Sequence, residues 1–119
     1  MIPESHETDP VATNPNLYRT VFENERVRVL EYRDVPGDVT APHHHPDSVM
    51  ITLSAFHRRV SAGGREVDVD LAAGEVRWVG AQSHVGENTG RTPTHTFFVE
   101  LKEPADGAVS TATTLGPTS

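Results

Sequence analysis

Histidine is the residue of this chain whose number and spacing point to chemistry. The chain has seven histidines in 119 residues, and three of them, His43, His44 and His45, are consecutive. If this segment is extended, His43 and His45 project from one side of the strand and His44 from the other. Two neutral imidazoles two positions apart are what a strand offers to Zn, Fe, Ni, Cu or Mn. An exposed polar loop rich in histidine would read the same way, so this pair alone leaves both interpretations open.

The parity of the two histidines relates them to the segment that follows. The odd-numbered positions that follow His43 and His45 are Asp47, Val49, Ile51 and Leu53. A straight strand would turn both imidazoles and Val49 toward a core, unless Pro46 shifts the register. Asp47 shares this parity and would be either a hydrogen-bond partner of a ligand or a more distant ligand, but Pro46-Asp47-Ser48 is also typical of an ordinary turn, which we favour.

The segment from Gly37 to His45 resembles the first motif of the cupin superfamily. Gly37, five residues, His43, one residue and His45 match the opening of that motif, G-x5-H-x-H. The motif continues with a glutamate three or four residues after the second histidine, where this chain has Val49 or Met50. The resemblance therefore implies two histidine ligands from this motif without its carboxylate.

A second stretch resembles the second cupin motif and brings a third histidine. Gly74 is followed after five residues by Gly80, which stands where proline is usual. His84 is followed after three residues by Asn88, and the stretch is one residue tighter than the family pattern. The resemblance covers about residues 17–103 and implies His84 as a third metal ligand.

The resemblance implies a small single-domain bacterial cupin. Such a chain is an all-β double-stranded β-helix or jelly-roll barrel, and it commonly pairs as a homodimer through its sheets. One divalent metal ion per chain is implied, held by His43, His45 and His84, as in the cupins that use three histidines. The replaced glutamate leaves the metal open among Fe, Zn, Ni and Mn, and leaves a metal-free pocket for an organic ligand as the alternative.

Three neutral imidazoles leave the double charge of such an ion uncompensated. The centre would be a strong Lewis acid with open positions, suited to anionic or chelating molecules. Iron would favour a dioxygenase, whereas Zn, Ni or Mn would favour isomerase or lyase chemistry. The alternative function is a non-catalytic cupin that binds or senses a small ligand, favoured by Val49 at the glutamate position and by the lack of a clear general base.

Other polar and aromatic residues are weaker candidates for the site. His95 lies in phase with Phe97 in the last apolar segment, where it is either an acid–base group of the pocket or a hydrogen-bonded barrel residue. Glu100 falls on the opposite face of that segment. Further candidates for the pocket wall are Val49, Trp78, Gln82 and Phe97.

These side chains need strands to position them, and the sequence supplies strands. Alternating apolar and polar residues recur about every ten positions, with no stripe of period 3.6, which indicates an all-β sandwich or barrel. Gly- and Pro-containing turns separate the expected strands, for example Pro36-Gly37-Asp38. The expected strands are 17–23, 26–32, 48–56, 66–71, 76–79 and 94–102.

Composition limits the remaining possibilities. The chain is long enough for one domain, which we place at 17–103 between flexible tails at 1–16 and 104–119. It has no cysteine, so thiolate ligands and disulfides are excluded. The formal charge of −7 argues against a nucleic-acid partner. We expect no membrane partner, because no apolar run is long enough to span a bilayer, and no secretory signal is visible, so we expect a cytoplasmic protein.

Overall fold

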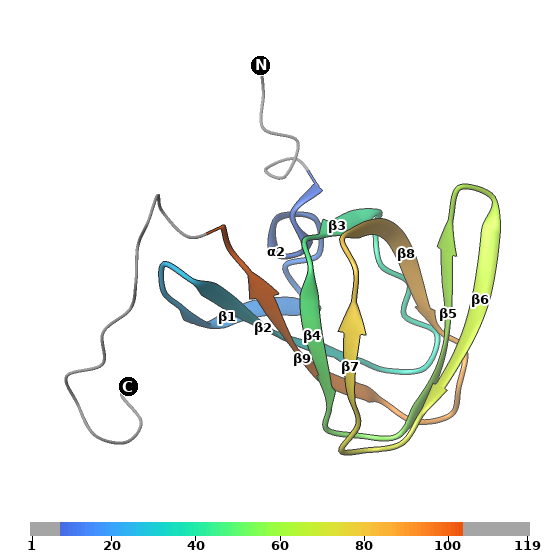
Figure 1. Cartoon of the computed structure of the whole chain (residues 1–119). Helices are drawn as coiled ribbons and strands as arrows, with labels where there is room; N and C mark the ends of the chain where they lie inside the picture. Colours follow the sequence, from blue (N-terminus) through green and yellow to red (C-terminus); the bar gives the residue numbers. More distant parts are fainter. Residues whose placement is uncertain (1–7, 104–119) are drawn as a thin grey trace.

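The strands pair into two antiparallel sheets that lie against each other (Figure 1). The structure, a computed structural model, describes residues 8–103, so residues 1–7 of the tail expected at 1–16, and the whole tail expected at 104–119, lie outside the described residues. Its elements are α2 (Pro10–Thr13), β1 (Tyr18–Glu23), β2 (Val27–Asp34), β3 (His43–His45), β4 (Ser48–Thr52), β5 (Phe56–Ala62), β6 (Arg65–Leu71), β7 (Val76–Val79), β8 (Gln82–Asn88) and β9 (Thr94–Leu101).

The two sheets confirm the all-β jelly-roll barrel. One sheet has five strands in the order β1-β2-β9-β4-β7, and the other has four in the order β3-β8-β5-β6. The strand expected at 48–56 ends at Thr52, because the chain turns before Phe56, where β5 begins, and β5 beyond Phe56 was not expected. Strand β8 was not expected, since its sequence QSHVGEN is polar and contains a glycine.

The chain changes sheets between β3 and β4. Strand β3 pairs with β8, whereas β4 pairs with β7 and β9. The crossing at Pro46 and Asp47 breaks the parity that would have carried the inward side from His45 to Val49. In β4 the buried positions are Ser48 and Thr52, so Val49 faces outward. The prediction that Val49 lines the pocket is therefore wrong.

The last strand turns its polar series inward. In β9, Thr94, Thr96, Phe98 and Glu100 are buried, and the residues between them are less so. Phe97 therefore lies on the outer face with His95, and the prediction that Phe97 lines the pocket is wrong. The apolar series is turned outward because this barrel encloses a partly polar cavity, so the rule that the apolar face points inward fails here.

Residues 8–16, which the sequence placed in a flexible tail, pack against the barrel. Asp9 caps α2, its carboxylate accepting from the backbone N–H groups of Val11 and Ala12, and it pairs with Arg28 of β2. Asn14 bonds the backbone of Ala41, just before β3. The N-terminal segment therefore helps to fix the strand that carries the consecutive histidines.

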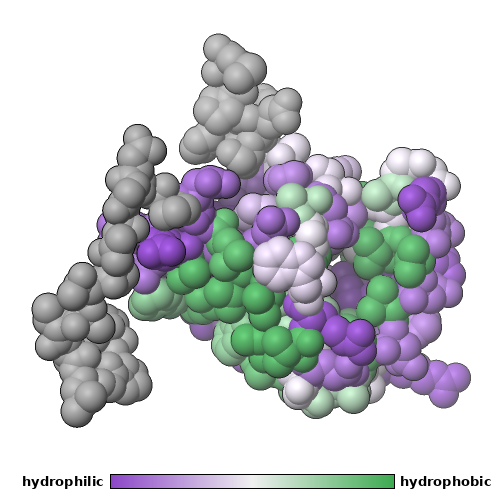
Figure 2. Space-filling model, in the orientation of Figure 1, coloured by the Kyte–Doolittle hydropathy of each residue, from purple (hydrophilic) through white to green (hydrophobic). Residues whose placement is uncertain are grey.

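A cavity of about 360 Å³ lies between the sheets. Its walls include Val67 and Val69 of β6 and Trp78 and Val79 of β7, the edge strands of the two sheets. Trp78 is 60% exposed, which places it at the opening. In Figure 2 the surface is hollowed between these edge strands, with apolar side chains on the wall. Among the described residues, no helix is long and apolar enough to cross a membrane.

Candidate metal centre

Three histidines from two neighbouring strands meet inside the barrel. His43 and His45 are the buried positions of β3, and His84 lies directly opposite His43 in the antiparallel pair with β8. The ring centroids of His43 and His84 are 4.7 Å apart, and one ligand atom from each of the three residues lies within 4.8 Å of the others. His44, between them, bonds Ser83 on the other side of the strand.

Each imidazole of this trio has its Nδ1 atom engaged. Nδ1 of His43 lies 2.9 Å from the Ala41 carbonyl, and Nδ1 of His84 lies 2.8 Å from Oε1 of Gln82. Nδ1 of His45 lies 3.2 Å from a carboxylate oxygen of Glu100. Because these three partners are acceptors, each Nδ1 carries the proton and each Nε2 has its lone pair directed away from that partner. This is the arrangement of metal-binding histidines, whose second nitrogen is oriented by an acceptor.

Burial also keeps His43 and His84 uncharged. It lowers the pKa of His43 to about 4, although the hydrogen bond to Ala41 opposes the shift. Burial, with the charges that His43 and His45 would carry, lowers the pKa of His84 to about 3. Both rings are therefore neutral at pH 7, the form that binds a metal ion.

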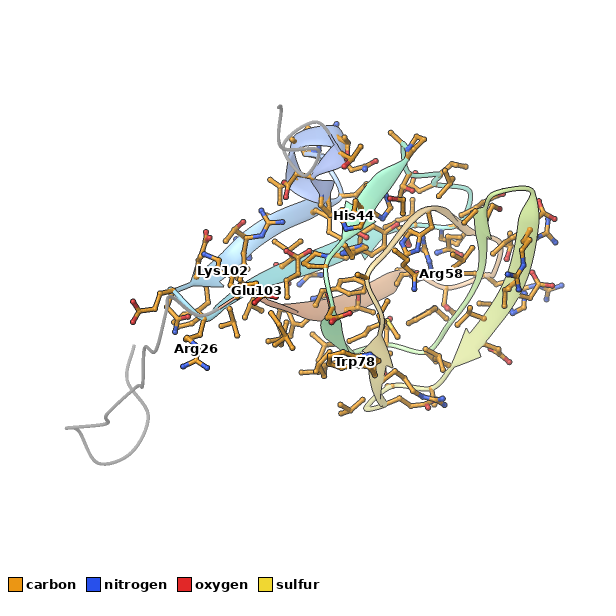
Figure 3. All side chains as sticks on the ribbon, turned by 45° about the horizontal axis from the view of Figure 1, so that its top comes forward. Arg26, His44, Arg58, Trp78, Lys102 and Glu103 are labelled. Carbon is orange, nitrogen blue, oxygen red and sulfur yellow. The ribbon has the colours of Figure 1, made fainter. Side chains whose placement is uncertain are left out.

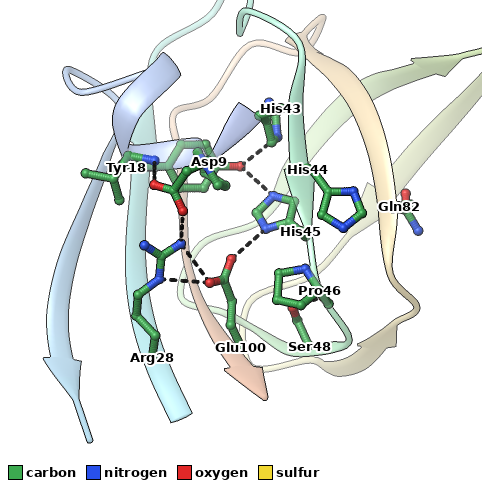
Figure 4. A network of polar contacts seen from close by, with 12 residues as sticks. Asp9, Tyr18, Arg28, His43, His44, His45, Pro46, Ser48, Gln82 and Glu100 are labelled. Carbon is green, nitrogen blue, oxygen red and sulfur yellow. Dashed lines mark hydrogen bonds and ion pairs between the residues drawn. The ribbon is translucent and has the colours of Figure 1, made fainter. Parts of the chain in front are cut away.

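A chain of charged groups extends outward from His45 (Figure 4). Glu100, 3% exposed, receives the Nδ1 hydrogen of His45 on one carboxylate oxygen and pairs with Arg28 at 2.8 Å on the other. Arg28 in turn pairs with Asp9 at the helix N-cap. The sequence placed Glu100 opposite His95 but did not connect it with the trio, because the contact joins residues 55 positions apart.

Tyr18 is a second residue that sequence reasoning missed. Its hydroxyl lies 3.3 Å from Nε2 of His43 and 3.2 Å from Nε2 of His45 (Figure 4). Burial, followed by the nearby Tyr32, raises its pKa well above the ordinary value, so it is a neutral phenol. The hydroxyl thus stands on the side of the trio where the free lone pairs converge. No spacing rule in the sequence connects a tyrosine in the first strand with these histidines.

The trio fits a divalent metal ion by the chemistry of its donor set. Three neutral imidazoles suit Zn, Fe, Ni or Mn, and the engaged Nδ1 atoms leave one lone pair per ring for the ion. The burial of His43 and His45 excludes the exposed histidine-rich loop that the sequence left open. The oxygen atom of the Tyr18 hydroxyl lies within hydrogen-bond distance of two of the three Nε2 atoms.

The weaker candidates fall into two groups. Trp78 and Gln82 line the cavity, and Gln82 also orients His84. His95 does not reach the cavity: its Nε2 lies 2.7 Å from Glu31 on the outer face of the five-stranded sheet. The structure therefore gives His95 the hydrogen-bonded structural position, and it corrects the interpretation of His95 as an acid–base group.

No protein-family model matches the chain, and no curated protein matches it. Among solved structures, the chain is similar to a cupin domain from Bordetella pertussis Tohama I. The two share 25% sequence identity over 73% of this chain and 93% of that chain, with a TM-score of 0.68. The chain has the cupin fold. The cupin barrel also matches an RmlC-like cupin family protein with a double-stranded β-helix fold from Methanocaldococcus jannaschii (11% identity, 71% of this chain and 78% of that chain, TM-score 0.58).

A third match extends over more of the chain. A cupin 2 conserved barrel domain protein from Salinispora arenicola CNS-205 is 17% identical over 83% of this cupin and 85% of that chain, with a TM-score of 0.53. At such identities the likeness establishes the fold and leaves the chemistry to be argued from the residues of the site.

Proposed function

We propose that this cupin binds one divalent metal ion through His43, His45 and His84 and acts there on a small chelating or anionic organic molecule. The observation that carries the proposal is the convergence of the three imidazoles with every Nδ1 atom held by an acceptor. A polar loop without a ligand has no reason to orient three inward-facing rings in this way.

When bound, the ion supplies Lewis acidity and open positions for the substrate, with dioxygenase chemistry for iron and isomerase or lyase chemistry for Zn, Ni or Mn. The chain itself supplies the orientation. Glu100, Ala41 and Gln82 fix the rings, and Phe98 stacks on His45 with ring centroids 4.8 Å apart. His43 and His45 are almost fully buried, which limits the contact of these two rings with bulk water.

The electrostatics of the site favour an anionic molecule. His43 and His84 are neutral, and Glu100 is balanced by Arg28. The residues that line the cavity, all within the described part of the chain, include no aspartate or glutamate. The charge of a divalent ion would thus face a cavity without a carboxylate of the protein, and a negatively charged substrate would supply the missing charge.

Elemental analysis of the purified and reconstituted protein tests the proposal. We expect about one equivalent of a single divalent metal per chain, with Fe, Zn, Ni or Mn as the candidates. A protein that holds no metal after purification and takes up none from a solution of these ions contradicts the proposal.

A non-catalytic ligand-binding cupin is the second candidate, and one observation favours it. Apart from the histidines, the titratable groups that line the cavity are Tyr18, Tyr32 and Arg58. Burial raises the pKa of both tyrosines, so neither serves as a base at neutral pH. This candidate predicts that a small ligand raises the melting temperature without being converted. Product formation from any such ligand would exclude it.

We also propose that the cupin pairs as a homodimer through the outer face of the five-stranded sheet. Val29, Val99 and Val49 lie opposite one another across β2, β9 and β4. Phe97, Ile51 and Val76 form a parallel row across β9, β4 and β7. We call these six side chains the outer apolar face. We expect a second copy of the chain to cover this face, because a twofold axis would place the identical apolar rows of the two copies against each other.

A further inference from the structure

A buried arginine stands in the cavity away from the histidine trio. Arg58 of β5 lies between the two sheets and lines the cavity (Figure 3). Its Nη1 atom bonds Asp34 and lies 3.1 Å from the Thr94 hydroxyl, and its Nη2 atom lies 3.1 Å from the Tyr32 hydroxyl. These partners hold the guanidinium in one place. The side chain keeps 11% exposure, and because Arg58 lines the cavity, the exposed part faces it.

A glycine lets this guanidinium approach the trio. Arg58 lies opposite Asn88 in the pair of β5 with β8, four positions from His84. A Cβ atom on Gly86, halfway between them, would be 2.6 Å from Nη2 of Arg58. The side chain therefore runs along β8 toward the histidines, until it covers the backbone of Gly86. Two strand positions separate Gly86 from His84, a span of roughly 6–7 Å.

The opposite wall of the cavity, formed by the other sheet, carries a hydroxyl without a partner. Phe98 stacks on His45, and Thr96 follows two positions away on the inner face of β9. Among the buried side-chain nitrogen and oxygen atoms of residues 8–103, the Oγ1 atom of Thr96 has no hydrogen-bond partner. Thr96 lines the cavity beside Tyr32, its neighbour across β2 and β9. A buried hydroxyl left unpaired points to a group that arrives with the ligand.

The hydrogen-bond donors of Arg58 and Thr96 suit a carboxylate. A guanidinium has five N–H groups, and three contacts of Arg58 are accounted for by Asp34, Thr94 and Tyr32. The remaining N–H groups are charge-assisted donors, which bind a carboxylate more strongly than a neutral acceptor. The Thr96 hydroxyl adds a neutral donor, and no acidic side chain lines the cavity within the described residues.

We propose that Arg58 and Thr96 form a subsite for a carboxylate group, so that this cupin binds small organic acids with two oxygen-bearing ends. One end is held by the metal at the histidine trio and the other by Arg58 and Thr96. The first half of this statement rests on the proposed function. The second half rests on Arg58, Gly86 and Thr96 alone, so the two are tested separately.

The experiment measures binding of dicarboxylates and matched monocarboxylates by calorimetry. Malonate, succinate and glutarate are compared with propionate, butyrate and pentanoate on the zinc-loaded protein. We expect at least one dicarboxylate to bind ten-fold or more tightly than the monocarboxylate of equal carbon number. Thr96→Val, which removes only the unpartnered hydroxyl and keeps the side-chain shape, is expected to fold normally and to reduce this ratio at least three-fold.

The matched control is Thr52→Val. Thr52 lies opposite Thr96 in the same row, but its hydroxyl is bonded to the backbone of Ala72 and Glu75, so the ratio should stay unchanged. Equal affinity for mono- and dicarboxylates, or a ratio insensitive to Thr96→Val, overturns the proposal. If the protein takes up no zinc, the proposed function fails, and binding of butyrate to the metal-free protein tests the subsite alone. That binding must weaken in Thr96→Val and persist in His84→Ala.

Discussion

Glu100 and His45 join the two sheets of this cupin at its histidine trio. The Oε2 atom of Glu100, on β9 of one sheet, lies 3.2 Å from Nδ1 of His45, on β3 of the other. Both side chains are almost fully buried. The carboxylate therefore sets the tautomer of the ring and at the same time fixes the ring against the opposite sheet. Metal affinity should depend on this contact although Glu100 does not itself contact a ligand atom of the trio.

Glu100→Gln is expected to weaken metal binding by roughly 10–100-fold, because an outer partner of a ligating histidine has an effect of that size. Competition of the protein with a chromophoric chelator for zinc measures the affinity. Glu31→Gln is the matched control, since Glu31 bonds His95 at 2.7 Å on the outer face of the same sheet. If the two variants lose affinity equally, or neither loses any, the role given to Glu100 is wrong.

His84→Ala is expected to abolish stoichiometric metal binding, since it removes one of three neutral donors. Inductively coupled plasma analysis of the reconstituted variant gives the metal content per chain. His44→Ala removes a neighbouring imidazole that bonds Ser83 away from the trio, so this variant should keep about one equivalent. Loss of metal in His44→Ala with retention in His84→Ala would show that the consecutive histidines bind in another register.

Asp34 should make the folded state sensitive to acid. Burial alone raises its pKa, but hydrogen bonds from Tyr32 and Asn88 and the charge of Arg58 outweigh burial and hold the pKa below its usual value of 3.8. Asp34 therefore stabilises the fold fully above its unfolded-state pKa, and this contribution is lost as pH falls from about 4 through the lower folded-state pKa. Urea denaturation between pH 6 and pH 3 should show a smaller loss of stability in Asp34→Asn than in the wild type. Parallel losses would contradict the assignment.

Gly86→Ala tests the approach of the arginine to β8. A Cβ atom would stand 2.6 Å from Nη2 of Arg58, so the guanidinium has to move and its bonds to Asp34 and Tyr32 weaken. We expect a loss of about 1–3 kcal/mol in the free energy of unfolding, as for other overpacked sites. Gly80→Ala is the control, because the nearest atom to its added Cβ is 4.0 Å away. Equal stability of the two variants would mean that Arg58 does not depend on this glycine.

Ile51→Lys should separate the proposed homodimer. The substitution places a charge in the middle of the outer apolar face, where desolvation of the ammonium opposes pairing. Size-exclusion chromatography with light scattering is expected to give a dimer for the wild type and a monomer for the variant. Val67→Lys changes an apolar residue of β6 that is 57% exposed and lies off this face, so it should stay dimeric. A monomeric wild type would refute the proposal.

The histidine trio and the barrel could be predicted from the sequence, because both depend on patterns within short segments of the chain. The alternation of apolar residues indicates the strands, and the spacings from Gly37 to His45 and from Gly74 to His84 indicate the two segments that meet. The outward turn of Val49 was not predictable by parity, since Pro46 and Asp47 lead the chain from one sheet to the other.

Three residues around the histidine trio and the cavity were beyond sequence reasoning. Tyr18, Arg58 and Glu100 meet their partners across the barrel, and each contact depends on the stacking of two sheets rather than on spacing within a strand. In β9 the pattern was also misleading for a physical reason. Phe97, Val99 and Leu101 face outward, where we expect a second copy to cover them, while Thr94 and Thr96 line the cavity and Glu100 is buried against His45.

The free edge at the cavity opening bears on how this cupin behaves at high concentration. Strand β6 pairs only with β5 within the described residues, so its other backbone edge has no neighbouring strand. Glu66, Asp68 and Asp70 alternate along this strand. Carboxylates at such an edge repel the same edge of another molecule and oppose strand-by-strand growth into fibrils. The edge can therefore stay uncovered, which leaves the route from solvent to the histidines free of a partner chain.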